Sequence, residues 1–168
     1  MILETKRLII RDFSEEDLDA LAPILGDPQV MEYSMTGPLS REDTSTCLQK
    51  RIFQHYQEHG YGLWALISKE TSQLIGFAGP IHQEVDGEKC VEIGYRLAPS
   101  EWGEGLATKA VIAIRDYAIK ELKLDKLIAI IEPTNIRSTR VAEKAGFKLA
   151  KQTIFHGFNV GIYTYGKT

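Results

Sequence analysis

Residues 91–111 place a strand, a glycine-containing loop and a helix directly after one another, and this succession constrains the fold more than any other stretch. Val91, Ile93, Tyr95 and Leu97 alternate with polar or small residues, which predicts a strand that ends before Pro99. Apolar residues then recur at helical spacing: Ala107, Ala110, Val111, Ile114, Ala118 and Leu122.

The loop between this strand and helix contains Trp102-Gly103-Glu104-Gly105-Leu106-Ala107. Small residues allow a ligand to approach the backbone, and a helix start offers free N–H groups at the positive end of its dipole, so a phosphate is the expected ligand. The spacing is neither Gly-x-Gly-x-x-Gly nor Gly-Lys-Ser/Thr, which disfavours a dinucleotide fingerprint and a Walker loop. A strand–helix connection without a ligand is the alternative.

Composition indicates an ordinary folded domain of 168 residues, with 43% apolar and 26% charged residues. A net charge of −3 argues against nucleic acid or an anionic membrane as the main partner. No apolar run reaches ~18 residues, and the N-terminal residues run directly into a strand, so we expect no membrane span, no signal peptide and a cytoplasmic location. Cys47 and Cys90 fit no metal or redox spacing, so we expect free thiols.

Periodicity along the chain predicts one α/β domain, residues 1–168, with the element order βααβββαβαββ. The strands are expected at 7–13, 62–68, 74–81, 90–97, 127–131, 147–155 and 160–165. The helices are expected at 18–25, 41–59, 107–122 and 135–145. Asp86-Gly87 predicts a hairpin turn, and residues 30–39 are expected to be irregular.

This order resembles that of the GNAT acetyltransferases, whose central sheet is mixed, mostly antiparallel and flanked by helices. The sequence Gly103-x-Gly105-x-Ala107 after "Glu-Ile-Gly-Tyr-Arg-Leu-Ala-Pro" resembles the acetyl-CoA loop of that family. The similarity is closest to the Rim-type branch, which acetylates ribosomal-protein N-termini. Further matches, which extend the resemblance over nearly the whole chain, lie at residues 4–8, 62–65, 74–76, 132–138 and 143–147.

The resemblance implies acetyl-CoA as co-substrate and no metal. The residues expected to bind it are Gly103, Glu104, Gly105, Leu106, Ala107 and Thr108 in the loop, the backbone of Leu97, and Asn135 and Ser138 beside the pantetheine arm. Helix capping is the alternative role for Asn135 and Ser138. The side chains of Glu101 and Glu104 are expected to point to solvent, away from the phosphates.

Two positions depart from the family pattern. Trp102 stands where many members carry Gln or Arg, so backbone N–H groups would have to bind more of the pyrophosphate. Ala142 stands where many members carry a general-acid tyrosine, so that mechanism is not available at this position.

Glu92 on the central strand is the candidate general base, with a salt-bridged strand glutamate as its alternative role. Ser138 is the candidate proton donor to the leaving thiolate, although a thiol of pKa ~8.5 leaves with little help. His82 and His156 are reserve bases. His55-Tyr56-Gln57-Glu58-His59 matches a zinc-protease string, but no third ligand is apparent and Gly60 ends the helix, so we interpret it as a polar helix end.

Tyr33, Met35 and Trp64 are expected to contact the acceptor, with a place in the core as their alternative role. The resemblance suggests the contact, because the loop between the first two helices walls the acceptor site in relatives. The sequence therefore predicts transfer of an acetyl group to a primary amine, by direct attack in a ternary complex. An α-amine of a protein N-terminus or an amino-acid-like molecule is expected. The alternatives are a CoA-binding module without catalysis and a small-molecule detoxifying enzyme. We expect a monomer or homodimer.

Overall fold

An eight-stranded sheet forms the centre of the computed structural model, which describes residues 1–167. Its strand order is β1-β2-β3-β4-β5-β6-β8-β7, and every neighbouring pair is antiparallel except β5 and β6. The strands are β1 Leu3–Glu4, β2 Leu8–Arg11, β3 Trp64–Ser68, β4 Leu74–Val85, β5 Glu88–Leu97, β6 Lys126–Ile131, β7 Lys148–Phe155 and β8 Phe158–Gly166. The prediction of a mixed, mostly antiparallel sheet is confirmed.

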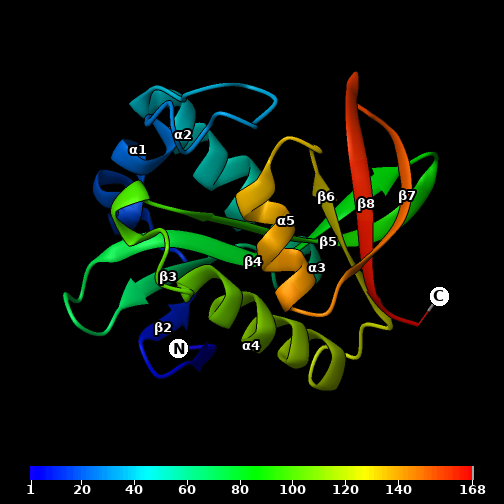
Figure 1. Ribbon diagram of the computed structural model, residues 1–168. Helices are drawn as coiled ribbons and strands as arrows, with labels where there is room; N and C mark the ends of the chain where they lie inside the picture. Colours follow the sequence, from blue (N-terminus) through cyan, green and yellow to red (C-terminus); the bar gives the residue numbers. More distant parts are fainter. Residues whose placement is uncertain (168) are drawn as a thin grey trace.

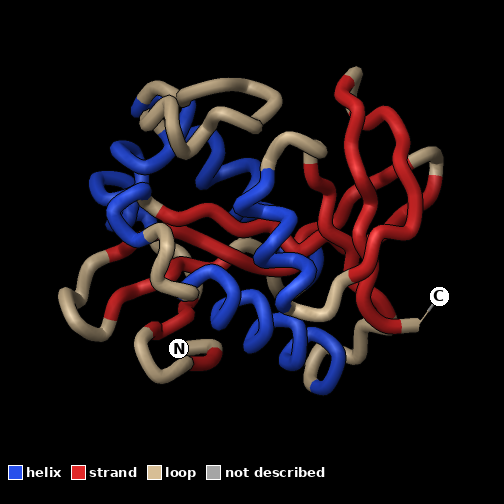
Figure 2. The backbone as a smooth tube through the Cα atoms, in the orientation of Figure 1, coloured by secondary structure: helices blue, strands red, loops and turns tan. Residues whose placement is uncertain are grey.

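Helices cover both faces of this sheet (Figures 1 and 2). They are α1 Leu18–Leu25, α2 Arg41–Cys47, α3 Gln54–His59, α4 Leu106–Lys120 and α5 Ile136–Lys144, with short 3₁₀ turns at Glu15–Asp17 and Pro99–Glu101. One core cluster joins α4 and α5 to the sheet through residues such as Val111, Ile114 and Ile93. A second cluster joins α1 and the α2–α3 segment to the opposite face, through residues such as Leu21 and Phe77. None of the helices among residues 1–167 is long and apolar enough to span a bilayer.

The predicted elements are present, with two differences in the N-terminal half. The first strand is shorter than expected, and a short β1 precedes it, because the Thr5 hydroxyl accepts the Leu8 N–H and turns the chain. The second helix contains a π-helical segment, Leu48–Phe53, between α2 and α3, and it ends at Gly60 in the left-handed conformation (φ 78°). Such π segments are often found at functional sites.

The contact between β5 and β6 is the feature that positions the site. β4 and β5 pair along their whole length, from Gly76↔Leu97 to Val85↔Glu88. The parallel pairing of β5 with β6 consists of one residue pair, Glu92↔Ile128. Residues 93–97 of β5 therefore have no ladder partner in β6, and an opening lies between the two strands.

Candidate active site

A cavity of about 700 Å³ occupies this opening. β5 contributes Glu92–Arg96, and β6 with its following residue contributes Ala129–Glu132. Most of the rest of its wall comes from the α1–α2 loop, the α2–π helix, β4, the start of α5 and the β7–β8 hairpin. A smaller cavity of about 90 Å³ adjoins it, between the start of α5 and the β5–α4 loop, and Tyr95, Arg96, Asn135 and Ser138 line both.

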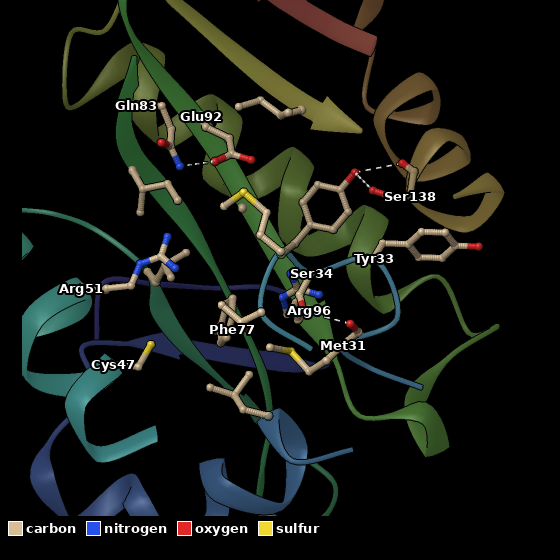
Figure 3. Close-up of a pocket in the computed structure, with 18 of the residues that line it drawn as sticks. Met31, Tyr33, Ser34, Cys47, Arg51, Phe77, Gln83, Glu92, Arg96 and Ser138 are labelled. Carbon is tan, nitrogen blue, oxygen red and sulfur yellow. Dashed lines mark hydrogen bonds between the residues drawn. The ribbon is translucent and has the colours of Figure 1, made fainter. Parts of the chain in front are cut away.

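Glu92 lies in the wall of the larger cavity, partly exposed to it. Removal from bulk water raises the pKa of its carboxyl group to about 7, although the Gln83 hydrogen bond and the charges of Arg51 and Arg96 oppose this shift. Gln83 Nε2 donates to Glu92 Oε1 at 3.0 Å and fixes the carboxylate at the cavity, as Figure 3 shows. A carboxylate with this pKa can accept a proton near neutral pH.

Tyr95 and Ser138 form a hydrogen-bonded pair across the opening. The Tyr95 hydroxyl donates to the backbone oxygen of Ser138 at 2.9 Å and accepts from the Ser138 hydroxyl at 2.9 Å. Burial raises the pKa of Tyr95 to about 12, so this phenol keeps its proton at neutral pH. Tyr95 was not predicted as a site residue, because no local sequence pattern indicates its contact with Ser138, 43 residues away.

The β5–α4 loop leaves room for a ligand at the start of α4. Gly103 (φ 82°) and Gly105 (φ 76°) are in the left-handed conformation, and a Cβ added to either would meet no protein atom within 4 Å. The N–H groups of Leu106, Ala107 and Thr108 follow directly in the first helical turn, where no intrahelical acceptor exists. The Glu104 side chain is drawn aside by an exposed ion pair with Arg7 at 3.0 Å. The open backbone and free donors fit a pyrophosphate.

An unpredicted cation, the Arg137 guanidinium, also lies beside this loop. The Arg137 guanidinium stacks 3.5 Å from the centre of the Trp102 ring, and both side chains line the smaller cavity. The Trp102 indole N–H donates to the Leu97 backbone oxygen at 2.9 Å, so that oxygen already has a partner. Trp102 thus positions Arg137 instead of supplying a charge itself.

Asn135 is the N-cap of α5, and its side-chain oxygen accepts the Ser138 N–H at 3.2 Å. Its amide NH₂ group is not needed for this cap, and the residue lines both cavities. Capping and ligand contact are therefore compatible at this position.

The structure separates the three residues expected at the acceptor. Tyr33 and Met35 line the larger cavity, and the Tyr33 hydroxyl donates to the Thr134 backbone oxygen at 3.2 Å. The expectation for Trp64 is wrong: its side chain is 1% exposed and packs edge-on against Tyr117 of α4. Side chains alternate along a strand, so Leu63 faces the cavity while Trp64 faces the opposite core.

The histidines lie elsewhere. His82 stacks on His59 with ring centres 3.6 Å apart and bonds to Tyr61, while His156 sits in the β7–β8 turn, so neither reserve base lines the cavity. Within residues 1–167, no group of three or more His, Cys, Asp or Glu side chains is arranged to hold a metal ion.

Cys47, and not Cys90, lines the larger cavity. Burial raises the pKa of the Cys47 thiol, which disfavours the thiolate that a nucleophilic cysteine would need. Arg51 and Arg96 also lie in the wall. Periodicity and spacing in the sequence carry no signal that brings these three residues together.

Comparison with known proteins identifies the family of this chain. The protein-family model described as "Acetyltransferase (GNAT) domain" matches residues 7–148 of the sequence. YkkB of Bacillus subtilis is 34% identical over 152 residues, which cover 89% of this chain and 86% of YkkB. The N-acetyltransferase YnaD of the same organism is 32% identical and covers 88% of this chain and 83% of its own.

Solved structures agree in fold. A GNAT acetyltransferase from Bacillus anthracis superimposes with a TM-score of 0.82 at 29% identity, covering 98% of this chain and 97% of its own.

The ribosomal-protein-serine acetyltransferase of Escherichia coli is a further relative in sequence. It is 30% identical over 110 residues, which cover 66% of this chain and 59% of that protein. The expected resemblance, including its Rim-type component, is confirmed.

The position of Glu92 predicts a pH-dependent stability. A carboxyl whose pKa is raised in the folded state binds its proton more tightly there, so its contribution to stability is lost as the pH rises from about 4.5 to 7. Glu92→Gln keeps the oxygen that accepts from Gln83 and removes the buried charge. We expect its free energy of unfolding in urea to exceed that of the wild type by on the order of 1–3 kcal/mol at pH 8, and by much less at pH 4.5.

The exposed Glu84→Gln on β4 is the matched control and should show no such pH-dependent gain. An equal difference between Glu92→Gln and wild type at both pH values would contradict the raised pKa.

Proposed function

Since the chain belongs to the GNAT acetyltransferase family and is an acetyl-CoA-dependent N-acetyltransferase, we propose that it acetylates a primary α-amine by direct attack within the β5–β6 opening. The observation that carries this proposal is the placement of Glu92 and the Tyr95–Ser138 pair around one cavity. The opening gives an amine and a thioester a common place to meet.

Glu92 is proposed as the general base. An amine enters as its ammonium form, and only the neutral form attacks. The ionised Glu92 carboxylate takes the ammonium proton, directly or through one water. The amine nitrogen then forms a bond to the acetyl carbon, and the carbon–sulfur bond breaks with its electron pair on sulfur. The nitrogen loses its second proton, which neutralises the leaving thiolate. Its pKa of about 7 makes the carboxylate available at neutral pH.

The Tyr95–Ser138 pair is proposed to face the leaving sulfur. The Tyr95 phenol holds its proton at neutral pH and accepts a hydrogen bond from the Ser138 hydroxyl. It can donate its proton to the sulfur and regain one from the proton that the nitrogen loses. Because a thiol has a pKa of ~8.5, the leaving thiolate needs only modest stabilisation. This arrangement offers a tyrosine from β5 in place of the one that Ala142 does not provide.

The loop Gly103–Thr108 is proposed to bind the pyrophosphate of acetyl-CoA, with Arg137 as the nearby cation. When bound, acetyl-CoA supplies the activated acetyl group. Leu97, Asn135 and Ser138, all in the wall of the smaller cavity, are proposed to hold its pantetheine arm.

The acceptor is proposed to be a small molecule with an α-amine, or a protein N-terminus whose first residue enters the cavity. A volume of about 700 Å³ lies in the range of small-molecule sites. At pH 7 a lysine ε-amine of pKa ~10.4 costs about 4.6 kcal/mol to deprotonate, against roughly 1–1.4 kcal/mol for an α-amine of pKa ~7.7–8.0. A single carboxylate base is better matched to the second.

Substitution of Gly105 tests the proposed phosphate site. Gly105→Val adds a side chain where the free backbone is open, so it should obstruct the ligand and not the protein core, with added strain from the positive φ. We expect acetyl-CoA affinity, measured by calorimetry, to fall at least 10-fold.

Gly87→Val is the matched control, because it places the same side chain at a similar φ in the distant β4–β5 turn, also in open space. Unchanged affinity in a folded Gly105→Val variant would rule out the proposed phosphate site.

The choice of amine is tested by competition at pH 7 between a peptide with a free N-terminus and no lysine and its N-capped, lysine-containing counterpart. We expect faster acetylation of the free N-terminus, followed by mass spectrometry. Faster acetylation of the capped lysine peptide would refute the α-amine preference, and no acetylation of either peptide or of free amino acids would refute the proposed function.

A further inference from the structure

Arg96 brings a positive charge into the cavity without a carboxylate to neutralise it. Its side chain lies on the same face of β5 as that of Glu92, since side chains alternate along a strand. Its Nη1 donates to the Val30 backbone oxygen at 3.0 Å. Within residues 1–167, no carboxylate lies within 4 Å of its guanidinium nitrogens, so most of its five N–H donors are available.

Partial burial of an unpaired guanidinium costs free energy, and an anion that pairs with it offsets this cost. Burial lowers the pKa of Arg96, and the opposing effect of Glu92 does not compensate for it. A ligand that enters the cavity with an acidic group would supply the missing charge and could accept two parallel hydrogen bonds from the planar fork.

Arg51 is a second cation at this cavity, with an exposed side chain. It comes from the π-helical segment between α2 and α3 and lines the same cavity. Among the described residues it has no hydrogen-bond or ion-pair partner. The charges of Arg51 and Arg96 both lower the pKa of Glu92, so both act on the proposed site of the amine. Figure 3 shows the two guanidinium groups entering from different elements, below Glu92.

We infer that the acceptor is a small primary amine that also carries an anionic group, a carboxylate or a phosphonate, and that Arg96 and Arg51 bind this group. The inference rests on the proposed function and narrows it, because it selects acidic amines of the amino-acid class from the wider set of α-amines.

The spacing along β5 allows the amine and the acid group of one acceptor to bind at different residues. Glu92 and Arg96 are four residues apart, so their Cα atoms are about 13 Å apart along the strand, and the two long side chains shorten the gap. Gly94 lies between them and leaves an apolar floor formed with Leu63 and Ile81. A small molecule can therefore place its amine toward Glu92 and its acid group toward the arginines.

The other ionisable groups in the wall do not cancel this preference. Lys50 adds a third cation, while Asp43 and Glu132 add two carboxylates, neither within 4 Å of an arginine nitrogen. A polycationic acceptor would be repelled by Arg96 and Arg51 in the cavity wall. Preference for such an acceptor is therefore the outcome that contradicts the inference.

The experiment compares leucine with its neutral analogue leucinamide, and adds the phosphonate analogue of leucine and a diamine. Initial rates of CoA release from acetyl-CoA are measured at pH 7 for leucine and leucinamide, for 1-amino-3-methylbutylphosphonate, and for a diamine. We expect kcat/KM for leucine and the phosphonate to exceed that for leucinamide and the diamine by roughly 10-fold or more. A carboxylate makes its neighbouring amine more basic, so intrinsic reactivity opposes this result.

Which acid the site prefers follows from the same panel. A higher kcat/KM for leucine than for the phosphonate identifies a carboxylate site, and the reverse identifies a phosphonate or phosphate site. Both results support the inference, whereas equal or faster acetylation of leucinamide or the diamine overturns it.

Two variants assign the preference to the arginines. Arg51→Gln changes an exposed residue, so the variant should fold normally. Arg96→Met removes the partly buried guanidinium of β5. In each, the ratio of kcat/KM for leucine over leucinamide should fall at least 10-fold. Arg140→Gln removes one charge from the exposed side of α5, outside both cavities, and should leave the ratio unchanged. An unchanged ratio in both Arg51→Gln and Arg96→Met overturns the assignment.

A binding measurement separates failure of this inference from failure of the proposed function. If no amine is acetylated, the proposed function is contradicted, and calorimetry with the CoA-loaded protein still decides the inference. Tighter binding of N-acetylleucine than of N-acetylleucinamide supports it, and equal or weaker binding refutes it.

Discussion

The opening between β5 and β6 is the constraint on which the rest of the structure depends. β5 is paired along its whole length with β4, but it meets β6 at the single pair Glu92↔Ile128. Beyond this pair β5 and β6 diverge, and the strand that holds Glu92 also borders the larger cavity. The β5–α4 loop and the start of α4 continue β5, and together with the α1–α2 loop they line the smaller cavity. One strand therefore positions the proposed base, the phosphate site and the acceptor cavity together.

Apolar side chains such as Phe77 and Ile93 line the cavity together with its charged groups. Desolvation outweighs the effect of the nearby arginines at Glu92 and keeps its pKa near neutrality. The same desolvation keeps the Tyr95 phenol protonated. An acidic group and a phenol with these properties can accept and hold a proton at neutral pH, which suits attack by an amine that must first lose one.

Local sequence patterns were sufficient where local geometry decides the structure. The alternation from Val91 to Leu97, the two glycines and the helical repeat predicted the strand, loop and helix, and Gly105 does precede the free N–H groups of α4. Contacts between distant segments were not predictable. Tyr95 meets Ser138, 43 residues away, through the way β5 and β6 diverge. Trp64 was misplaced because alternation shows that neighbouring residues face opposite sides, but not which side holds the cavity.

The most direct test of this account is the kinetics of Glu92→Gln. If Glu92 is the base that deprotonates the amine in the opening, kcat should fall by roughly 10²–10⁴-fold while acetyl-CoA affinity stays within about twofold of the wild type. The decline of kcat/KM below pH 7 should become shallower in the variant, because one titrating group has been removed. A folded Glu92→Gln enzyme with wild-type kcat and an unchanged pH profile would contradict the account.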